Sequence, residues 1–133
     1  MIAFDEALGL VGEVARPLGR ERVAVGEAAQ RVLAEPVVAM IDAPPADASA
    51  MDGYAVRDPD VPGRLRVVGE AFAGRGFDGR VEPGTAVRIF TGAPVPSGAD
   101  RVIVQEVVAR EGDVAIVAEP PGAARHIRAR GSD

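Results

Sequence analysis

Glycine and proline interrupt the middle of this chain so often that a long helix cannot form there. Residues 46–119 contain ten glycines and five prolines between short runs of β-branched residues. Glycine weakens a helix interior and proline breaks it, whereas both residues are frequent in the turns between strands. This pattern predicts a β-rich module, with strands near residues 65–69, 86–90, 101–109 and 114–117. The turn between the last two strands is expected to form a hairpin.

The first 45 residues have a different pattern. Apolar residues spaced three and four apart predict an amphipathic helix over residues 5–15, with Asp5 as its N-cap and Pro17 beyond its end. A short strand is expected over residues 22–25 and a second helix over residues 28–33. The expected fold class is therefore α+β, with strands predominating.

Composition excludes several classes of protein. The chain has no cysteine and one histidine, so disulfide frameworks, thiolate zinc sites and histidine-rich metal sites are excluded. The net charge of -5 argues against a nucleic-acid partner, and charged residues, glycine or proline interrupt every apolar run, which argues against a membrane span. The first residues lack the pattern of a secretory signal, so we expect a cytoplasmic protein.

Asp52 is the first candidate functional residue. It precedes Gly53 after a pair of prolines, and Asp-Gly is a common turn before a strand. The residues alone favour the interpretation that the carboxylate bonds its own turn. A second interpretation remains open, in which the turn holds the carboxylate at the edge of a cleft, where it binds Mg²⁺ or accepts a substrate proton.

The loop that begins at Thr91 is the second candidate. Pro94 and Pro96 restrict its backbone, and Gly92 allows close approach. Successive amides and the Thr91 hydroxyl could form a nest for an oxyanion such as phosphate or molybdate. A tight loop between two strands, without a ligand, is the alternative that the residues alone favour.

Two further groups of charged residues remain open from the sequence. Asp100 and Glu106 would form a pair of catalytic carboxylates if an unbroken strand placed them on one face. The three arginines of residues 125–130 could bind a phosphate together with His126, or could lie in a solvated tail.

Three motifs resemble one known family when they are taken together. Residues 49–56 read Ser-Ala-Met-Asp-Gly-Tyr-Ala-Val, residues 88–96 read Arg-Ile-Phe-Thr-Gly-Ala-Pro-Val-Pro, and residues 128–133 begin with Arg and end with Gly-Ser-Asp. In this order they resemble the N-terminal region of the molybdopterin molybdenumtransferase family, which includes MoeA and the gephyrin E domain. The likeness extends over essentially the whole chain.

The resemblance implies a division into two modules. Residues 1–45 and 120–133 would form a discontinuous helical and extended module, and residues 46–119 a compact β module inserted into it. The family's pterin-binding domain and its small C-terminal β domain would be absent from these 133 residues.

The resemblance also implies an activity. The family inserts molybdate into adenylylated molybdopterin, releases AMP and uses a divalent cation such as Mg²⁺. Its cleft lies at a homodimer interface, where the β module of one subunit faces the pterin-binding domain of the other. The positions that match functional residues of the family are Asp52, Thr91 and Asp133 as catalytic residues, Ser49, Gly92 and Ala93 as substrate-binding residues, and Asp52 as a candidate metal ligand.

Three functions follow as expectations. In the first, the chain is the N-terminal part of such an enzyme and is inactive alone. In the second, it is a stand-alone dimerisation or scaffold module that keeps the family fold without catalysis. In the third, it is a small oxyanion-binding protein that uses the Thr91 loop.

Overall fold

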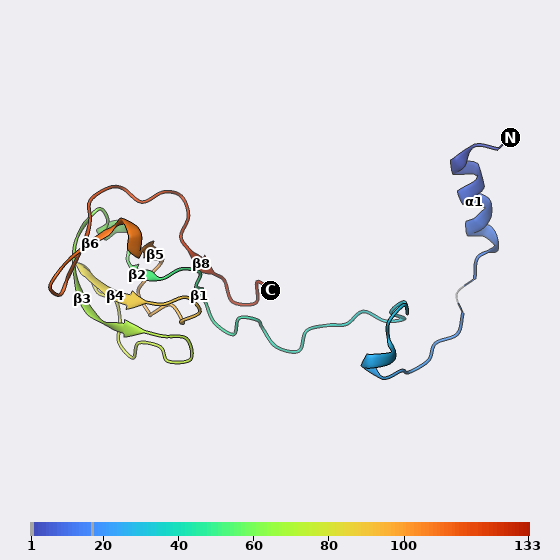
Figure 1. Cartoon of the computed structure of the whole chain (residues 1–133), viewed down its shortest axis with the longest axis horizontal. Coiled ribbons are helices and arrows are strands. Elements are labelled where there is room, and N and C mark those ends of the chain that lie inside the picture. The colour runs from blue at the N-terminus through green and yellow to red at the C-terminus, as the bar shows by residue number, and fades with distance from the viewer. Residues whose placement is uncertain (1, 17) are drawn as a thin grey trace. The chain divides into compact units, whose positions relative to one another are not determined.

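A computed structural model describes residues 2–16 and 18–133 of the chain, which divides into two compact units, Met1–Val38 and Ala39–Asp133. The first unit contains the α-helix α1 (Phe4–Val14) and the 3-10 helix η1 (Val25–Glu27) (Figure 1). The second unit contains β1 (Ala48–Ser49), β2 (Gly53–Val56), η2 (Asp58–Asp60), β3 (Gly63–Ala71), β4 (Thr85–Ile89), β5 (Arg101–Val104), η3 (Gln105–Val107), β6 (Val108–Glu111), β7 (Val114–Val117) and β8 (Ile127–Arg128).

Helix α1 confirms the amphipathic helix that the apolar spacing predicts. Its N-cap is Ala3 and not Asp5, and no side chain caps it. Asp5 lies in the first turn instead, where its negative charge interacts favourably with the positive end of the helix dipole. Pro17 lies outside the described residues. In the described part of the chain, no helix has the length and the apolar character needed to cross a membrane.

Two predictions for the first unit are wrong. The strand predicted over residues 22–25 does not form, since Val25 begins η1, and residues 28–33 form a turn and loop after η1 and no second helix. Gln30 has a φ of 64°, in the left-handed region that a right-handed helix excludes. The apolar residues of this segment have the spacing of a helix, but the backbone forms no helix there.

The second unit is built on a six-stranded sheet in the order β5-β2-β4-β3-β7-β6. Neighbouring strands are antiparallel except for β3 and β4, which are parallel. β3, β4 and β7 confirm three predicted strands, and Gly112 turns the predicted hairpin between β6 and β7 with a φ of 60°. The predicted strand over residues 101–109 is broken, because η3 separates β5 from β6.

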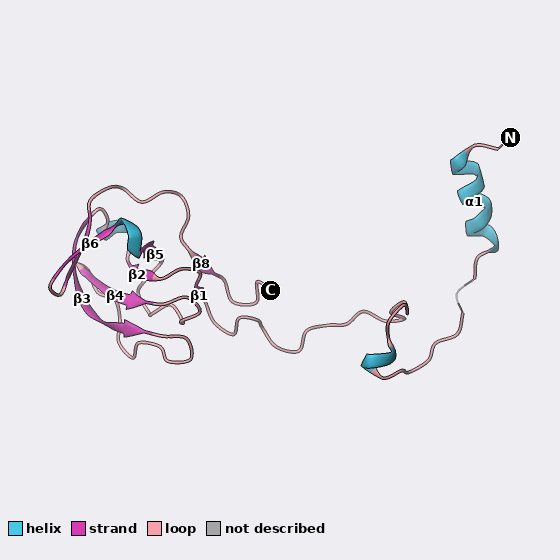
Figure 2. Cartoon of the chain, viewed as in Figure 1, coloured by secondary structure: helices cyan, strands magenta, loops and turns pink. Residues whose placement is uncertain are grey.

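Both faces of this sheet are buried. Tyr54 and Val56 belong to one core cluster with Ile103 and Val117, whereas Ala55 belongs to a second cluster on the opposite face. Three strands separate β5, which carries Ile103, from β7, which carries Val117. The sheet must therefore curl around the first cluster. Figure 2 shows the strands of this unit in magenta.

The β-rich fold confirms the predicted fold class, although the described residues form one α-helix where two helices were predicted. β8 pairs with β1. The last residues of the chain lie beside residues 43 and 44, where Asp133 N–H donates to the Ala43 carbonyl at 2.9 Å. These pairings attach the C-terminal segment to the start of the second unit. The discontinuous module of residues 1–45 and 120–133 stays a prediction.

Gly53 is required by the close approach of β5 to β2. A Cβ atom at residue 53 would lie 2.0 Å from the Ile103 carbonyl oxygen, so the backbone would have to move. We expect Gly53→Ala to lower the free energy of unfolding by about 2 kcal/mol or more, measured by urea denaturation. Gly122→Ala is the control, since a Cβ there would meet nothing within 4 Å. Equal stability of the two variants would contradict this account.

Candidate functional site

The register of the sheet brings three strand ends together. Gly53, the first residue of β2, pairs with Ile89 at the end of β4 and with Val104 at the end of β5. Asp52 precedes Gly53, and Thr91 and Gln105 follow the other two strands. All three residues therefore lie at the same end of the sheet, although the sequence separates them widely.

Asp52 and Thr91 make direct contact at this end. The backbone N–H and the hydroxyl of Thr91 each donate a hydrogen bond of 2.8 Å to Asp52 Oδ1. The bond from the Thr91 amide, then that from its hydroxyl, lowers the pKa of the Asp52 carboxyl, and the charge of Arg88 contributes further. The carboxylate is thus ionised and oriented, which suits an electrostatic or metal-binding role better than that of a base active near neutral pH.

Because the pKa of Asp52 is lowered in the folded chain, the stability of the chain should decrease at acidic pH. The pKa of Asp58 is also lowered, chiefly by a hydrogen bond from Arg101. Because each folded-state pKa lies below the unfolded value, each carboxylate stabilises the fold above that value, and the contribution is lost as the pH falls through the folded pKa. We expect the melting temperature, measured by circular dichroism, to fall below about pH 4.

The variant Asp58→Asn tests the origin of this effect, because it removes one of the two carboxylates whose pKa is lowered. Its melting temperature should depend less on acid than that of the unmodified chain. A melting temperature that stays constant down to about pH 2 in the unmodified chain would contradict the prediction.

The amides of residues 91–93 do not form the anion nest that the sequence left open. Thr91 N–H donates to Asp52, Gly92 N–H to the Ser49 carbonyl at 2.8 Å, and Ala93 N–H to the Phe90 carbonyl at 2.9 Å. The loop uses these donors to bind its own neighbours, so they are not free to surround an anion. The Thr91 hydroxyl keeps its acceptor lone pairs while it donates to Asp52.

The three predicted substrate-binding residues lie around this loop in different environments. Ser49 is fully buried, and its hydroxyl donates to the Met51 carbonyl at 2.6 Å. Ala93 is also fully buried, whereas Gly92 is exposed with a φ of 81°. Ser49 and Ala93 are therefore buried beside the Asp52 turn, where Ser49 N–H donates to the Ala93 carbonyl at 2.9 Å, and Gly92 is the one of the three that faces solvent.

Asp133 belongs to a separate group of ion pairs. Its carboxylate accepts hydrogen bonds from Arg128, one of them 2.5 Å long. Arg130 is paired with Asp42 at 2.6 Å, and Arg125 lies 3.7 Å from Asp58. Each arginine predicted to bind a phosphate thus has a carboxylate partner within the chain.

The carboxylates of Asp100 and Glu106 do not form the pair that the sequence left open. Asp100 precedes Arg101, which pairs with Val56 at the end of β2, and its carboxylate accepts the Asp58 N–H at 2.7 Å. Glu106 follows the opposite end of β5, in η3. The expected unbroken strand ends after Val104, so the two groups lie at opposite ends of β5.

A divalent cation would find one ligand here in Asp52. Among the described residues, no three of the side chains of histidine, cysteine, aspartate and glutamate are grouped closely enough to hold a metal ion. Mg²⁺ often binds through one or two carboxylates, with water and substrate phosphates completing its coordination. The Asp52 carboxylate fits such a site as a single protein ligand.

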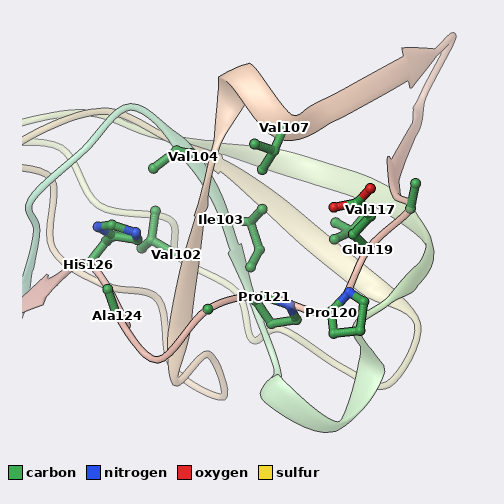
Figure 3. A pocket seen from close by; sticks show the side chains of 12 residues that line it. Val102, Ile103, Val104, Val107, Val117, Glu119, Pro120, Pro121, Ala124 and His126 are labelled. Carbon is green, nitrogen blue, oxygen red and sulfur yellow. The ribbon is translucent and has the colours of Figure 1, made fainter.

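An apolar groove of about 480 Å³ lies along β5, and neither Asp52 nor Thr91 lines it. Figure 3 shows Ile103 and Val107 facing Pro120 and Pro121 across it, with His126 and Glu119 at its two ends. The groove offers burial but few groups that can bind an ion or move a proton. The polar contacts of Asp52 and Thr91 are the stronger candidate for chemistry.

The aromatic and cationic neighbours of this pair were not singled out from the sequence. Arg88 and Tyr54 are partners in the β2–β4 register, and the Arg88 guanidinium lies 5.2 Å from the centre of the Tyr54 ring. The alternation within residues 85–90 could have shown that Arg88 and Phe90 share a face. Only the register of the sheet shows which face these two residues share and which residues lie beside them.

Comparison with known proteins gives one consistent result. A family model described as "MoeA N-terminal region (domain I and II)" matches residues 2–133. The molybdopterin molybdenumtransferases of Haemophilus influenzae and Synechococcus elongatus are 39% and 41% identical to the chain, over all of its length. A crystal structure of the molybdopterin biosynthesis MoeA protein from Pyrococcus horikoshii matches 98% of the chain with a TM-score of 0.80 and 37% identity.

The match covers a limited part of these relatives. The chain spans 34% of the H. influenzae protein, 36% of the S. elongatus protein and 36% of the P. horikoshii chain. About two-thirds of each relative therefore has no counterpart in these 133 residues.

Proposed function

Because this chain belongs to the MoeA N-terminal family, we propose that it is the N-terminal part of a molybdopterin molybdenumtransferase. In this function the enzyme inserts molybdate into adenylylated molybdopterin and releases AMP. The observation that carries the proposal is the Asp52 carboxylate, held by two hydrogen bonds from Thr91 where three strand ends meet. Both residues lie in the motifs that resemble the family.

The described geometry supports a defined role for each residue. Thr91 fixes Asp52 Oδ1 through two donors, so the carboxylate presents its remaining lone pairs in a set direction. The negative charge of Asp52 would repel an oxyanion unless a cation lies between them, which is a reason for a divalent cation at this site. When the cation is bound, it would neutralise the charge of molybdate and of the phosphate of adenylylated molybdopterin.

The remaining parts of the site would come from elsewhere. The chain spans about a third of its relatives, and it offers one candidate metal ligand at the Asp52–Thr91 pair. We therefore place the pterin-binding domain and a second subunit of a homodimer opposite this end of the sheet. On this account, the 133 residues bind no adenylylated molybdopterin productively by themselves.

A chimera tests this function. Residues 1–133 would replace the aligned first third of the H. influenzae relative, and the purified protein would be given adenylylated molybdopterin, molybdate and Mg²⁺. We expect the chimera to form molybdenum cofactor and release AMP, while the chain alone releases none. A folded chimera without activity, or a chain that is active alone, would contradict the proposal.

One observation supports the scaffold alternative. Helix α1 carries an apolar stripe whose members Phe4, Leu8 and Val11 are 79%, 60% and 59% exposed. A stripe of this kind is usually covered by another surface, as in a dimer. An inactive chimera that still dimerises through this helix would favour the scaffold.

A further inference from the structure

The Arg88 guanidinium lies close to two aromatic rings near the Asp52–Thr91 pair. Its guanidinium carbon is 5.2 Å from the centre of the Tyr54 ring and 4.7 Å from that of Phe90. The Phe90 ring stacks on Phe72 with 4.7 Å between centroids and an interplanar angle of 10°. Rings that flank a guanidinium attract it and limit the rotation of its plane. The Arg88 side chain is therefore held in place by its neighbours.

The same guanidinium binds the two segments that surround Asp52. Nη1 donates to the Gly53 carbonyl at 2.8 Å, and Nη2 donates to Gln105 Oε1 at 2.5 Å. The backbone N–H of Gln105 in turn donates to the Asp52 carbonyl at 3.1 Å. One planar group thus connects the residue that follows Asp52 with the residue that binds the Asp52 backbone.

The strand geometry explains why this residue can do so. Arg88 and Phe90 lie two residues apart in extended backbone, so their side chains project from the same face. Thr91 follows directly and turns its donors to Asp52. Residues 88–91 therefore supply both the donors to the carboxylate and the contacts that hold its backbone.

We propose that Arg88 is a positioning residue, which fixes the Asp52 turn so that the carboxylate accepts both hydrogen bonds from Thr91. Its catalytic consequence rests on the proposed function, whereas its effect on geometry concerns the chain alone. Among the described contacts, its hydrogen bonds go to Gly53 and Gln105, and it acts on the Asp52 carboxylate through them. Arginine is required because the planar fork reaches two acceptors at fixed angles, which an ammonium group cannot do.

Nuclear magnetic resonance of the 133-residue chain tests this role without substrate. The Thr91 amide reports the contact in two ways: its chemical shift follows the titration of Asp52, and its hydrogen exchange follows the strength of the bond. Arg88→Lys keeps the positive charge but loses the two-point contact. We expect about tenfold faster exchange of the Thr91 amide in this variant, and a smaller change of its shift with pH.

Arg88→Met removes both the charge and the contact. We expect the same loss of protection, together with an upward shift of the Asp52 titration midpoint. Arg110→Met is the matched control, because Arg110 also lies over the Tyr54 ring, at 5.9 Å, but donates to Gly112 and to the Tyr54 hydroxyl. It should leave both readouts of Thr91 unchanged.

If the Thr91 amide of Arg88→Lys exchanges at the wild-type rate, the proposal is overturned, because charge or packing alone would then account for the role of Arg88. If Arg88→Met does not fold, Arg88→Lys still decides, since it keeps most of the side chain and its charge. No substrate enters these measurements. An inactive chimera would therefore leave the result for Arg88 intact, and a negative result for Arg88 would leave the proposed function intact.

Discussion

Replacing Asp52 by asparagine should lower molybdenum insertion by about 100-fold or more in the chimera with the H. influenzae relative. Asparagine has nearly the same shape but no charge, so it can neither bind a divalent cation well nor keep both Thr91 bonds at full strength. The rate of AMP release would be measured with saturating molybdate. Since Asp52 lies in a turn at the end of the sheet, the variant should fold.

Two further variants make this result specific. Thr91→Val removes the hydroxyl donor to Asp52 and keeps the amide donor, so its activity should lie between those of the unmodified chimera and Asp52→Asn. Asp113→Asn also neutralises a carboxylate, but at the exposed turn between β6 and β7, and it should retain full activity. Equal losses in Asp52→Asn and Asp113→Asn would show that net charge matters and that the site does not.

Replacing Arg101 by methionine should produce the largest loss of stability, about 3 kcal/mol in the free energy of unfolding. The Arg101 side chain is 8% exposed and pairs through Nε with Asp58. Its Nη1 donates to the carbonyls of Gly122 and Ala124, both at 2.8 Å. Methionine would fill the space, but it would leave the carboxylate and both carbonyls without their donor. Urea denaturation of the 133-residue chain measures the change.

The exposed pair of Arg64 and Glu111 supplies the control for this prediction. It is 2.8 Å long, like many ion pairs, but its side chains are 60% and 63% exposed. Arg64→Met should therefore change stability by about 0.5 kcal/mol or less. Arg101→Lys should lose most of what Arg101→Met loses, because lysine cannot reach Asp58 and two carbonyls together. Similar stability of Arg101→Met and Arg64→Met would contradict the argument.

Local pattern was sufficient to predict helix α1 and three of the strands in the described residues. The spacing of apolar residues found α1, and runs of β-branched residues between glycine and proline found β3, β4 and β7. These signals work because side-chain period and turn residues are properties of neighbours in the sequence. The same signals failed at residues 28–33, where Gln30 adopts a left-handed backbone, and at residues 101–109, where η3 divides the strand.

The motifs identified Asp52 and Thr91 as candidates, but they could not show that the two residues touch. Thirty-nine positions separate them, and their contact depends on the pairing of Gly53 with Ile89 across β2 and β4. Pairing across a sheet is set by the packing of both faces and by turn geometry, which no single segment contains. The end of β5 at Val104 and the start of η3 separated Asp100 from Glu106, and contacts with neighbouring segments used the amides of residues 91–93.

The sequence by itself determined the β-rich class of the second unit, the helix near the N-terminus and the family motifs, because each depends on residues close together in the chain. Only the tertiary structure decided the partners of each charge: Thr91 for Asp52, Arg128 for Asp133, and Gly53 with Gln105 for Arg88. The physical reason is that a hydrogen bond requires its two atoms within about 3 Å. For Asp52 and Arg88, that distance is fixed by strand register and side-chain packing across the six-stranded sheet.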